Sequence, residues 1–400
     1  MTHLKHLILR TALAVCVIAA TATAEKVHLI VHIPADTRAS DSIYLAGSLT
    51  SVGGWKADGV KLARQHDGTL TGDLDVEIGQ TLEFKITRGS WDTVEKFADG
   101  GERPNRSIRI DASTKQIEAT VERWASGDGG ARRASTVVGT LKLHPIDSAA
   151  LKQPRTIRVW LPPGYDDASD ARYPVLYMHD GQNCFDRATS AFGNEWEIDE
   201  TLTKLISEKT IPPLIVIGID NGGANRINEF TYEVDPRHGG GHADTYVRFV
   251  LREVMPFVGK TYRVRTGTSS TFIGGSSLGG LISLEIARRN PHVFGGVIAM
   301  SPSLQWSNEA LTTAIEKDPG GLSDPRIWLD MGTREGLATA ATQPAINQHD
   351  PMIDAVNRLG AALAHHGIKH HLEIAEGAEH NERAWAARFP KAVKYLLGGD

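Results

Sequence analysis

Residues 271–280 constrain the fold more than any other part of this 400-residue chain. They read TFIGGSSLGG, an apolar run that leads into Gly-x-Ser-x-Gly and then directly into a helix-compatible stretch. Gly275 and Gly279 carry no Cβ atom, so a strand can turn sharply into a helix there and leave Ser277 exposed at the strand end. This order of elements predicts a strand–turn–helix unit. It favours a role for Ser277 as a nucleophile over the alternative, a glycine-rich turn without a chemical role.

From residue 136 onward, extended runs alternate with helical stretches. Strands are expected at residues 156–161, 175–178, 214–219, 271–273, 296–300, 326–329 and 371–374, and helices at 244–258, 278–289, 352–364 and 382–397. Asp244 is the expected N-cap of the first of these helices. The alternation predicts an α/β fold, with a mostly parallel sheet and helices on both of its faces.

Residues 25–123 follow a different pattern. Short alternating runs at 27–33, 42–45, 82–86, 108–110 and 117–121 are separated by clusters of Gly, Asp, Asn and Pro, which indicates a small all-β sandwich. Residues 124–135 contain few apolar side chains and are expected to form a linker. The chain is therefore predicted to hold a β-sandwich domain, a linker and an α/β domain over residues 136–400.

The first 24 residues predict a secretory signal peptide. Lys5 and Arg10 lie in or before an apolar run, and Ala22-Thr23-Ala24 offers small side chains for cleavage. The apolar run is much shorter than the ~20 residues that span a bilayer, so a membrane anchor is disfavoured. Cleavage would remove Cys16 and leave Cys184 as the one cysteine. A secreted or periplasmic protein without an internal disulfide is expected.

The composition excludes some classes of function. The chain has 41% hydrophobic and 23% charged residues, which is the balance of a soluble globular protein. Its formal net charge is −5, which argues against nucleic acid as a partner. After removal of the signal peptide, no membrane span is expected.

A serine needs a base to become a nucleophile, and the base needs an acid that orients it. For a serine in such a strand–turn–helix unit, the expected chain order is serine, acid, histidine. His380 follows the strand at 371–374 and a short loop, whereas the other downstream histidines lie near a helix end or at the start of a strand. Two acids stay open. Glu335, in the loop after the strand at 326–329, is favoured over Asp330, which ends that strand.

Attack by Ser277 on a carbonyl creates a negative oxygen, which needs backbone N–H donors. The expected pair is the N–H of Leu278, at the helix N-terminus, and that of Gln182, in the polar loop after the strand at 175–178. Cys184 follows closely but has no evident base partner, so it is expected to pack in the core. The clustered histidines have no acidic or cysteine partners at ligand spacing. No metal and no organic cofactor is expected.

These residues resemble the esterase branch of the α/β-hydrolase superfamily, which includes feruloyl and acetylxylan esterases, siderophore trilactone esterases, S-formylglutathione hydrolase and the mycolyltransferases. The resemblance covers nearly all of residues 136–400 and rests on motifs at 177–183, 218–221, 226–230, 275–279, 301–303 and 332–335. In that family the triad acid stands where Glu335 stands here. The resemblance also implies a set of residues that line the substrate site, for each of which a structural role stays open: Asp180, Arg226, Glu229 and Trp306.

The N-terminal domain resembles a starch-binding-type carbohydrate module, on motifs at 44–48, 54–55, 84–89 and 104–106. In such modules aromatic faces stack on sugar rings and polar groups bind the hydroxyls. The resemblance implies these roles for Trp55, Lys85 and Asn105. Lys96 stands where a second stacking tryptophan is expected, and Trp91 in the adjoining loop is the candidate replacement. A glucan is therefore a candidate ligand. The other reading is a spacer that shields or shapes the active site.

The sequence as a whole predicts an exported serine esterase that acts on an acylated carbohydrate or a phenolic ester, either a small molecule or a polysaccharide. A siderophore trilactone esterase and an acyltransferase to a sugar hydroxyl use the same chemistry and stay open as alternatives. A non-catalytic carbohydrate-binding protein is the alternative from another class. The complete set of Ser277, Glu335 and His380 argues against that last reading.

Overall fold

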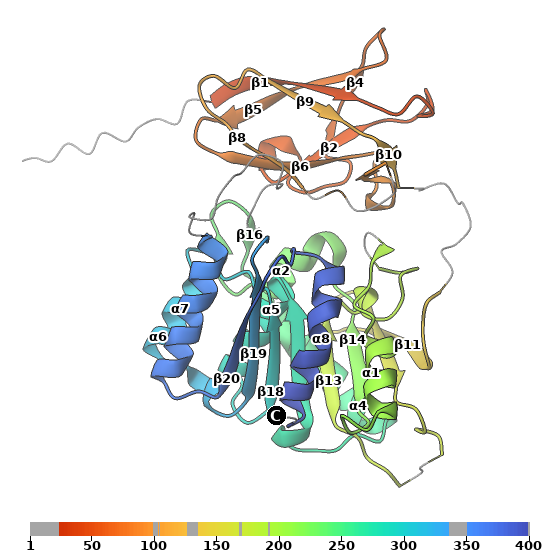
Figure 1. Ribbon diagram of the computed structural model, residues 1–400, viewed down its shortest axis with the longest axis vertical. Coiled ribbons are helices and arrows are strands. Elements are labelled where there is room, and N and C mark those ends of the chain that lie inside the picture. The colour runs from red at the N-terminus through yellow and green to blue at the C-terminus, as the bar shows by residue number, and fades with distance from the viewer. Residues whose placement is uncertain are drawn as a thin grey trace, which may run out of the picture.

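Figure 1 shows the computed structural model, which describes residues 24–98, 103, 105–125, 135–167, 170–190, 193–335 and 350–398. A β-domain precedes an α/β domain along the chain. The predicted signal peptide, except its last residue, and residues 126–134 of the predicted linker lie outside these ranges. In the described part of the chain, no helix is long and apolar enough to cross a membrane.

The β-domain contains two four-stranded sheets, in the orders β4-β5-β1-β9 and β3-β2-β6-β8, and a two-stranded ribbon, β10-β7. Its strands are β1 (Ala24–His32), β2 (Tyr44–Gly47), β3 (Val60–Lys61), β4 (Ala63–Arg64), β5 (Leu70–Glu77), β6 (Thr81–Thr87), β7 (Glu95–Lys96), β8 (Arg106–Arg109), β9 (Gln116–Thr120) and β10 (Arg123–Trp124). Alternate residues such as Val27, Leu29 and Val31 enter a core shared by both sheets. The predicted all-β domain is confirmed. Strand β10 continues it to Trp124, one residue into the predicted linker.

The α/β domain is built on one sheet of eight strands, in the order β11-β12-β14-β13-β17-β18-β19-β20. The pairs β11–β12 and β12–β14 are antiparallel and the other neighbours are parallel. The strands are β11 (Thr140–Asp147), β12 (Pro154–Leu161), β13 (Val175–His179), β14 (Ile215–Ile219), β17 (Thr271–Ser276), β18 (Gly296–Met300), β19 (Arg326–Gly332) and β20 (His370–Ala375). Seven of them match the predicted runs, so the mostly parallel sheet is confirmed.

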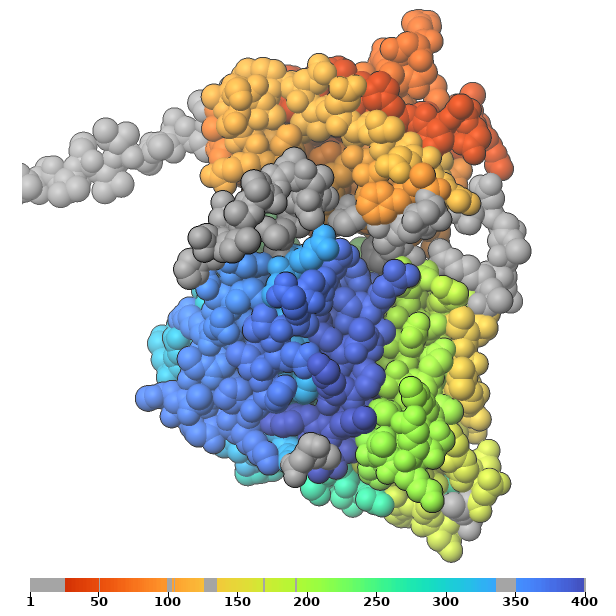
Figure 2. Space-filling view, in the orientation of Figure 1, coloured from red at the N-terminus to blue at the C-terminus, as the bar shows by residue number. Residues whose placement is uncertain are grey.

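Helices cover both faces of this sheet. One face packs against α1 (Ile198–Ser207) and α8 (Glu382–Leu396). The other packs against α3 (Ala243–Phe249), α4 (Met255–Thr261), α5 (Leu278–Arg289), α6 (Ala310–Lys317) and α7 (Pro351–His365). In Figure 1, α1 and α8 lie on the near side of the sheet. Figure 2 shows the same face, with the blue C-terminal part of the chain beside the yellow-green segment that contains α1.

The helix predicted at 244–258 differs in its details. It consists of α3, a π-helical turn (Val250–Val254) and α4, and its N-cap is His242, so Asp244 lies in the first turn and the predicted cap is wrong. Pro256 stands at the start of α4 and has no N–H to continue the α-helical hydrogen-bond ladder. This accounts for the wider turn that precedes it.

The parallel strands bring the candidate residues to one edge of the sheet, since their carboxyl ends all lie there. Strand β13 leads into the 3₁₀ turn Gly181–Asn183, and β17 leads into Ser277. Residues 301–303 follow β18, Glu335 follows β19 and His380 follows β20. Segments from five strands thus meet at a single edge.

Candidate active site

Ser277 lies in the sharp turn between β17 and α5. Its backbone has φ 56° and ψ −125°, a combination that residues with a Cβ atom adopt only where the surroundings impose it. The Ser277 N–H donates to the Met300 carbonyl at 3.0 Å, and the Ser277 carbonyl accepts from the Ser303 N–H at 3.1 Å. A Cβ atom at Gly275 would lie 2.9 Å from the carbonyl carbon of Gly279. The turn therefore requires glycine at position 275.

Glu335 and His380 form a hydrogen-bonded pair across two neighbouring strand ends. Glu335 Oε2 lies 3.0 Å from His380 Nδ1. Glu335 Oε1 faces the other way and accepts from the Gly332 N–H at 2.7 Å and the Ser301 hydroxyl at 2.6 Å. The Glu335 side chain is fully buried, and that of His380 is 31% exposed. One carboxylate oxygen is thus free to orient the imidazole while the other is fixed by the protein.

Asp330, the other acid that the sequence left open, makes different contacts. It lies within β19 and accepts from Trp328 Nε1 at 2.7 Å and from the Ser301 N–H at 3.2 Å. Burial raises the pKa of Asp330 to about 6, although Arg388 opposes the shift. Among the described residues, the carboxylate bonded to His380 is that of Glu335.

Arg388 contacts both acids and the Ser301 hydroxyl. It lies in α8, is 4% exposed, and its Nη2 is 2.7 Å from Ser301 Oγ, 3.2 Å from Glu335 Oε1 and 3.3 Å from Asp330 Oδ1. Trp385, one turn earlier, donates to Ser301 Oγ at 2.9 Å and packs its ring edge to face with His380 at 5.0 Å. Neither residue is predicted from the sequence. The signal that could have identified Arg388 is its place on the apolar face of the helix at 382–397, where a charged residue is unusual.

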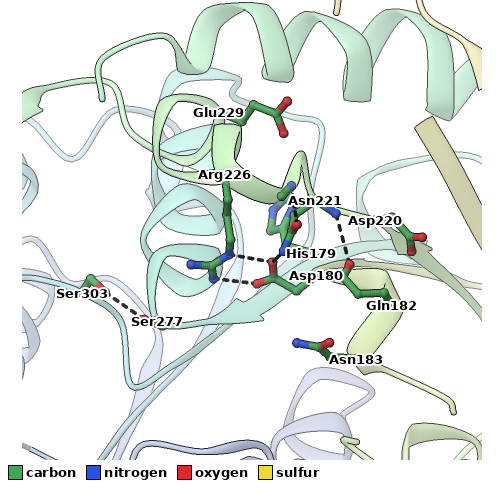
Figure 3. A network of polar contacts seen from close by, with 12 residues as sticks. His179, Asp180, Gln182, Asn183, Asp220, Asn221, Arg226, Glu229, Ser277 and Ser303 are labelled. Atoms are coloured by element: carbon green, nitrogen blue, oxygen red, sulfur yellow. Dashed lines mark hydrogen bonds and ion pairs between the residues drawn. The ribbon is translucent and has the colours of Figure 1, made fainter. Parts of the chain in front are cut away.

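The Ser277 hydroxyl bonds Ser303 Oγ at 3.1 Å (Figure 3). In the described residues no hydrogen bond joins it to His380. Hydrogen bonds between such groups are often loose without substrate and tighten only when it binds.

The two predicted N–H donors lie at neighbouring strand ends: Leu278 begins α5 after β17, and Gln182 lies in the turn after β13, which pairs with β17. Among the described residues, neither the Leu278 N–H nor the Gln182 N–H donates to another group. Gly181 places the Gln182 turn directly against β14, since a Cβ atom there would lie 2.4 Å from the carbonyl carbon of Gly218. Asp180, which precedes the turn, has φ 56°. The packing of Gly181 thus fixes the turn that holds Gln182, whose N–H stays without an acceptor among the described residues.

Asp180, Asn221 and Arg226 form a polar network beside these donors (Figure 3). Arg226 binds both oxygens of Asp180 at 2.7 Å, and Asn221 Nδ2 donates to Asp180 Oδ1 at 2.6 Å. Burial opposes ionisation of Asp180, but the contacts with Arg226 and Asn221 outweigh it and lower the pKa of the carboxyl. The Arg226 side chain keeps 26% exposure. Of the pair, Arg226 is the better placed to meet a substrate.

Glu229 differs from the expectation that it lines the substrate site. It is 2% exposed, and Arg155 binds its two oxygens at 2.7 and 2.8 Å. Figure 3 shows its carboxylate on the far side of Arg226 from Ser277. A buried carboxylate needs such a partner, so its role is structural. Trp306 is half-buried, with its indole N–H donated to the Glu233 carbonyl at 2.7 Å.

In the β-domain, two of the predicted sugar-binding residues are neighbours. The rings of Trp55 and Trp91 lie 6.5 Å apart and are tilted by 42°. Asn105 is exposed. Lys85 departs from the prediction, because it is 6% exposed and its ammonium donates to the Arg103 carbonyl. Lys96 is 4% exposed, within β7.

Comparison with known families places both domains. The sequence profile of a family described as "Putative esterase" matches residues 148–396, and that of a family described as "Starch binding domain" matches residues 26–120.

Individual relatives match the α/β domain. The uncharacterized protein YbbA of Bacillus subtilis is 26% identical over 253 residues, which are 61% of this chain and 93% of that protein. Ferri-bacillibactin esterase BesA of the same species is 26% identical over 198 residues, 45% of this chain and 64% of BesA. Among solved structures, the siderophore hydrolase EstA of Aspergillus nidulans aligns with a TM-score of 0.51 at 21% identity, over 64% of this chain and 95% of EstA. That structural likeness concerns the fold.

Proposed function

Since the chain belongs to the putative esterase family, and is thus a carboxylic ester hydrolase by family, we propose that it is an exported serine esterase. The observation that carries the proposal is the Glu335–His380 pair, bonded at 3.0 Å at the same sheet edge as Ser277. The strained backbone of Ser277 and the glycines around it support its assignment as nucleophile.

In the proposed reaction, Ser277 Oγ attacks the ester carbonyl while His380 Nε2 accepts the hydroxyl proton. Glu335 accepts a hydrogen bond from the Nδ1–H of His380 and stabilises the imidazolium. His380 then returns the proton to the departing alcohol, which leaves an acyl group on Ser277. A water molecule, deprotonated by His380, attacks this acyl-enzyme and releases the carboxylic acid and the free serine.

The N–H groups of Gln182 and Leu278 are the proposed donors to the negative oxygen of each tetrahedral intermediate. Leu278 begins α5, so its N–H lies at the positive end of the helix dipole. Donors fixed before the reaction cost no reorganisation when charge develops.

An acylated carbohydrate or a phenolic ester is the proposed substrate, and a glucan is the proposed ligand of the β-domain. The match to a starch binding domain and the adjacent faces of Trp55 and Trp91 support this choice. The similarity to BesA, a ferri-bacillibactin esterase, supports a siderophore ester as the second candidate. The acyltransferase alternative differs only in the acceptor, a sugar hydroxyl in place of water.

Hydrolysis of p-nitrophenyl acetate by wild type and by Ser277→Ala tests the chemistry. Loss of hydrolysis in Ser277→Ala is expected, with Ser269→Ala, at the opposite end of β17, as the matched control. Activity that survives in Ser277→Ala contradicts the assignment. Absence of activity in the wild type favours a non-catalytic binding protein.

A panel of feruloyl, acetylated xylan and trilactone siderophore esters, with and without a sugar acceptor, then separates the substrate classes. Hydrolysis of the siderophore ester alone would replace the carbohydrate-ester proposal. Accumulation of an acylated sugar would identify a transferase.

The proposed export rests on the predicted signal peptide at residues 1–24. Mass spectrometry of the protein from its host is expected to find an N-terminus at Glu25. A retained N-terminus would contradict export by cleavage.

A further inference from the structure

Three acidic side chains converge near the start of α1, away from the proposed triad. Glu195 precedes the helix, and Asp199 and Glu200 lie in its first turn. A ligand oxygen from each lies within 4.8 Å of those from the other two. Glu195 is 7% exposed and Asp199 is fully buried.

Two of these carboxylates bind the protein through one oxygen, and their other oxygen has no partner in the part of the chain that the structure describes. Glu195 Oε1 accepts from the Arg187 N–H at 3.1 Å and from the Thr136 hydroxyl. Asp199 Oδ2 accepts from the Val138 N–H at 2.6 Å. The opposite oxygens, Glu195 Oε2 and Asp199 Oδ1, are buried and have no hydrogen-bond partner among the described residues, and the same holds for Glu200 Oε2. Buried unpartnered oxygens on three adjacent acids carry a high desolvation cost.

We propose that Glu195, Asp199 and Glu200 bind a calcium ion. A hard divalent cation prefers carboxylate oxygens, and calcium takes them at about 2.3–2.6 Å in flexible geometry. Oxygens within 4.8 Å of one another can share one such ion. Magnesium keeps several of its waters and is usually held by only one or two carboxylates, so three converging acids favour calcium. Neither a metal nor this cluster is predicted from the sequence.

A bound ion would stabilise the packing of the first residues of the α/β domain against the rest of that domain. Thr136 and Val138 donate to the ligand carboxylates. On the other side, the Trp196 N–H donates to the Asn183 carbonyl at 2.9 Å, at the end of the turn that holds Gln182. The ion therefore stabilises both the entry into the domain and the loop beside Ser277.

A proton is the competing occupant. Burial and the neighbouring Glu200 raise the pKa of Asp199 to about 8, so a proton shared by these two acids would also relieve their repulsion. The two occupants differ in their response to added calcium.

Thermal unfolding of the full chain, stripped with EDTA and titrated with CaCl₂, is the test. At a hundredfold excess over Kd, the melting temperature is expected to rise by about 5 °C. Terbium supplies an independent probe, since the buried Trp196 next to Glu195 is positioned to sensitise its luminescence. Both responses are expected to disappear in Asp199→Asn and to persist in Glu316→Gln, a surface acid paired with Arg358.

If Asp199→Asn does not fold, Glu200→Gln, at the half-buried edge of the cluster, takes its place. If millimolar calcium does not shift the melting temperature and terbium gives no luminescence, the site is overturned and the shared proton remains. Equal responses in wild type and in the Asp199 or Glu200 variant would overturn it as well. A larger shift with MgCl₂ than with CaCl₂ would overturn the choice of calcium. Ester hydrolysis is measured separately, because the site does not depend on the proposed reaction.

Discussion

The change Glu335→Gln tests the orienting acid without a change in side-chain volume. In the structure Glu335 Oε1 receives the Gly332 N–H at 2.7 Å and Arg388 Nη2 at 3.2 Å, two donors that cannot become acceptors. The amide oxygen of glutamine must therefore occupy the Oε1 position. Its NH₂ group then faces His380 Nδ1 and donates to it.

This reversal forces the His380 proton onto Nε2, where the imidazole cannot accept the proton of Ser277. The same change in a Ser-His-Asp triad lowers kcat by about 10⁴-fold. We expect a comparable loss here, which corresponds to about 5 kcal/mol of transition-state stabilisation. Steady-state hydrolysis of p-nitrophenyl acetate measures kcat, and thermal unfolding checks that the variant is folded.

Asp330→Asn is the matched control, because it makes the same chemical change, from a carboxylate to an amide, at a second buried acid that also contacts Arg388. Asp330 does not contact His380, so kcat is expected to fall by less than about tenfold, while stability falls because a buried partner of Arg388 is lost. Equal losses of kcat in two folded variants would refute the reasoning. So would a Glu335→Gln enzyme that keeps more than one tenth of the wild-type kcat.

Three further predictions concern the loop, the core and the β-domain. Gly181→Ala puts a Cβ atom 2.4 Å from the Gly218 backbone, so the Gln182 donor must move, and a folded variant is expected to lose about 10²-fold or more in kcat, the cost of one oxyanion donor. Burial lowers the pKa of His179 to about 4, so the folded state resists a proton that the unfolded chain takes up below pH 6.5. Because of His179, the free energy of unfolding of the wild type, measured by denaturant titration, is therefore expected to be about 3 kcal/mol lower at pH 4 than at pH 7. His179→Gln should remove this contribution to the pH dependence. Trp55→Ala is expected to weaken amylose binding about tenfold in affinity titrations and to leave p-nitrophenyl acetate hydrolysis unchanged.

The strand–turn–helix unit around Ser277 could be predicted from the sequence because the steric constraint on its turn involves residues close together in the chain. A Cβ atom at Gly275 would collide with the backbone of Gly279, only four residues later in the chain. The helix predicted at 278–289 is the observed α5, without displacement at either end. The positions of seven of the eight strands in the sheet, though not all of their ends, follow from short apolar runs, because a strand buried on both faces is apolar throughout.

The polar network behind the proposed triad could not be predicted in this way. Ser301 and Arg388 are 87 residues apart in the chain, and their contact depends on how α8 packs across the sheet. Glu229 is similar, because its partner Arg155 lies 74 residues earlier. Whether a charged side chain is exposed or buried depends on such distant partners, which the pattern of a single segment does not contain. Lys85 is a further case, because its ammonium donates to the carbonyl of Arg103, 18 residues later in the chain.

Two acids at the end of one strand show what the extra contacts decide. Asp330 and Glu335 both reach Arg388 Nη2, at 3.3 and 3.2 Å, so proximity to the arginine does not separate them. The difference is that the loop turns Glu335 back until Gly332 binds one of its oxygens and the second meets His380. Asp330 instead uses both oxygens as acceptors, one from the Ser301 N–H and one from Trp328 Nε1. A carboxylate can orient a histidine only if its position is fixed by one oxygen and its other oxygen is left over, and Glu335 alone of the pair satisfies that condition.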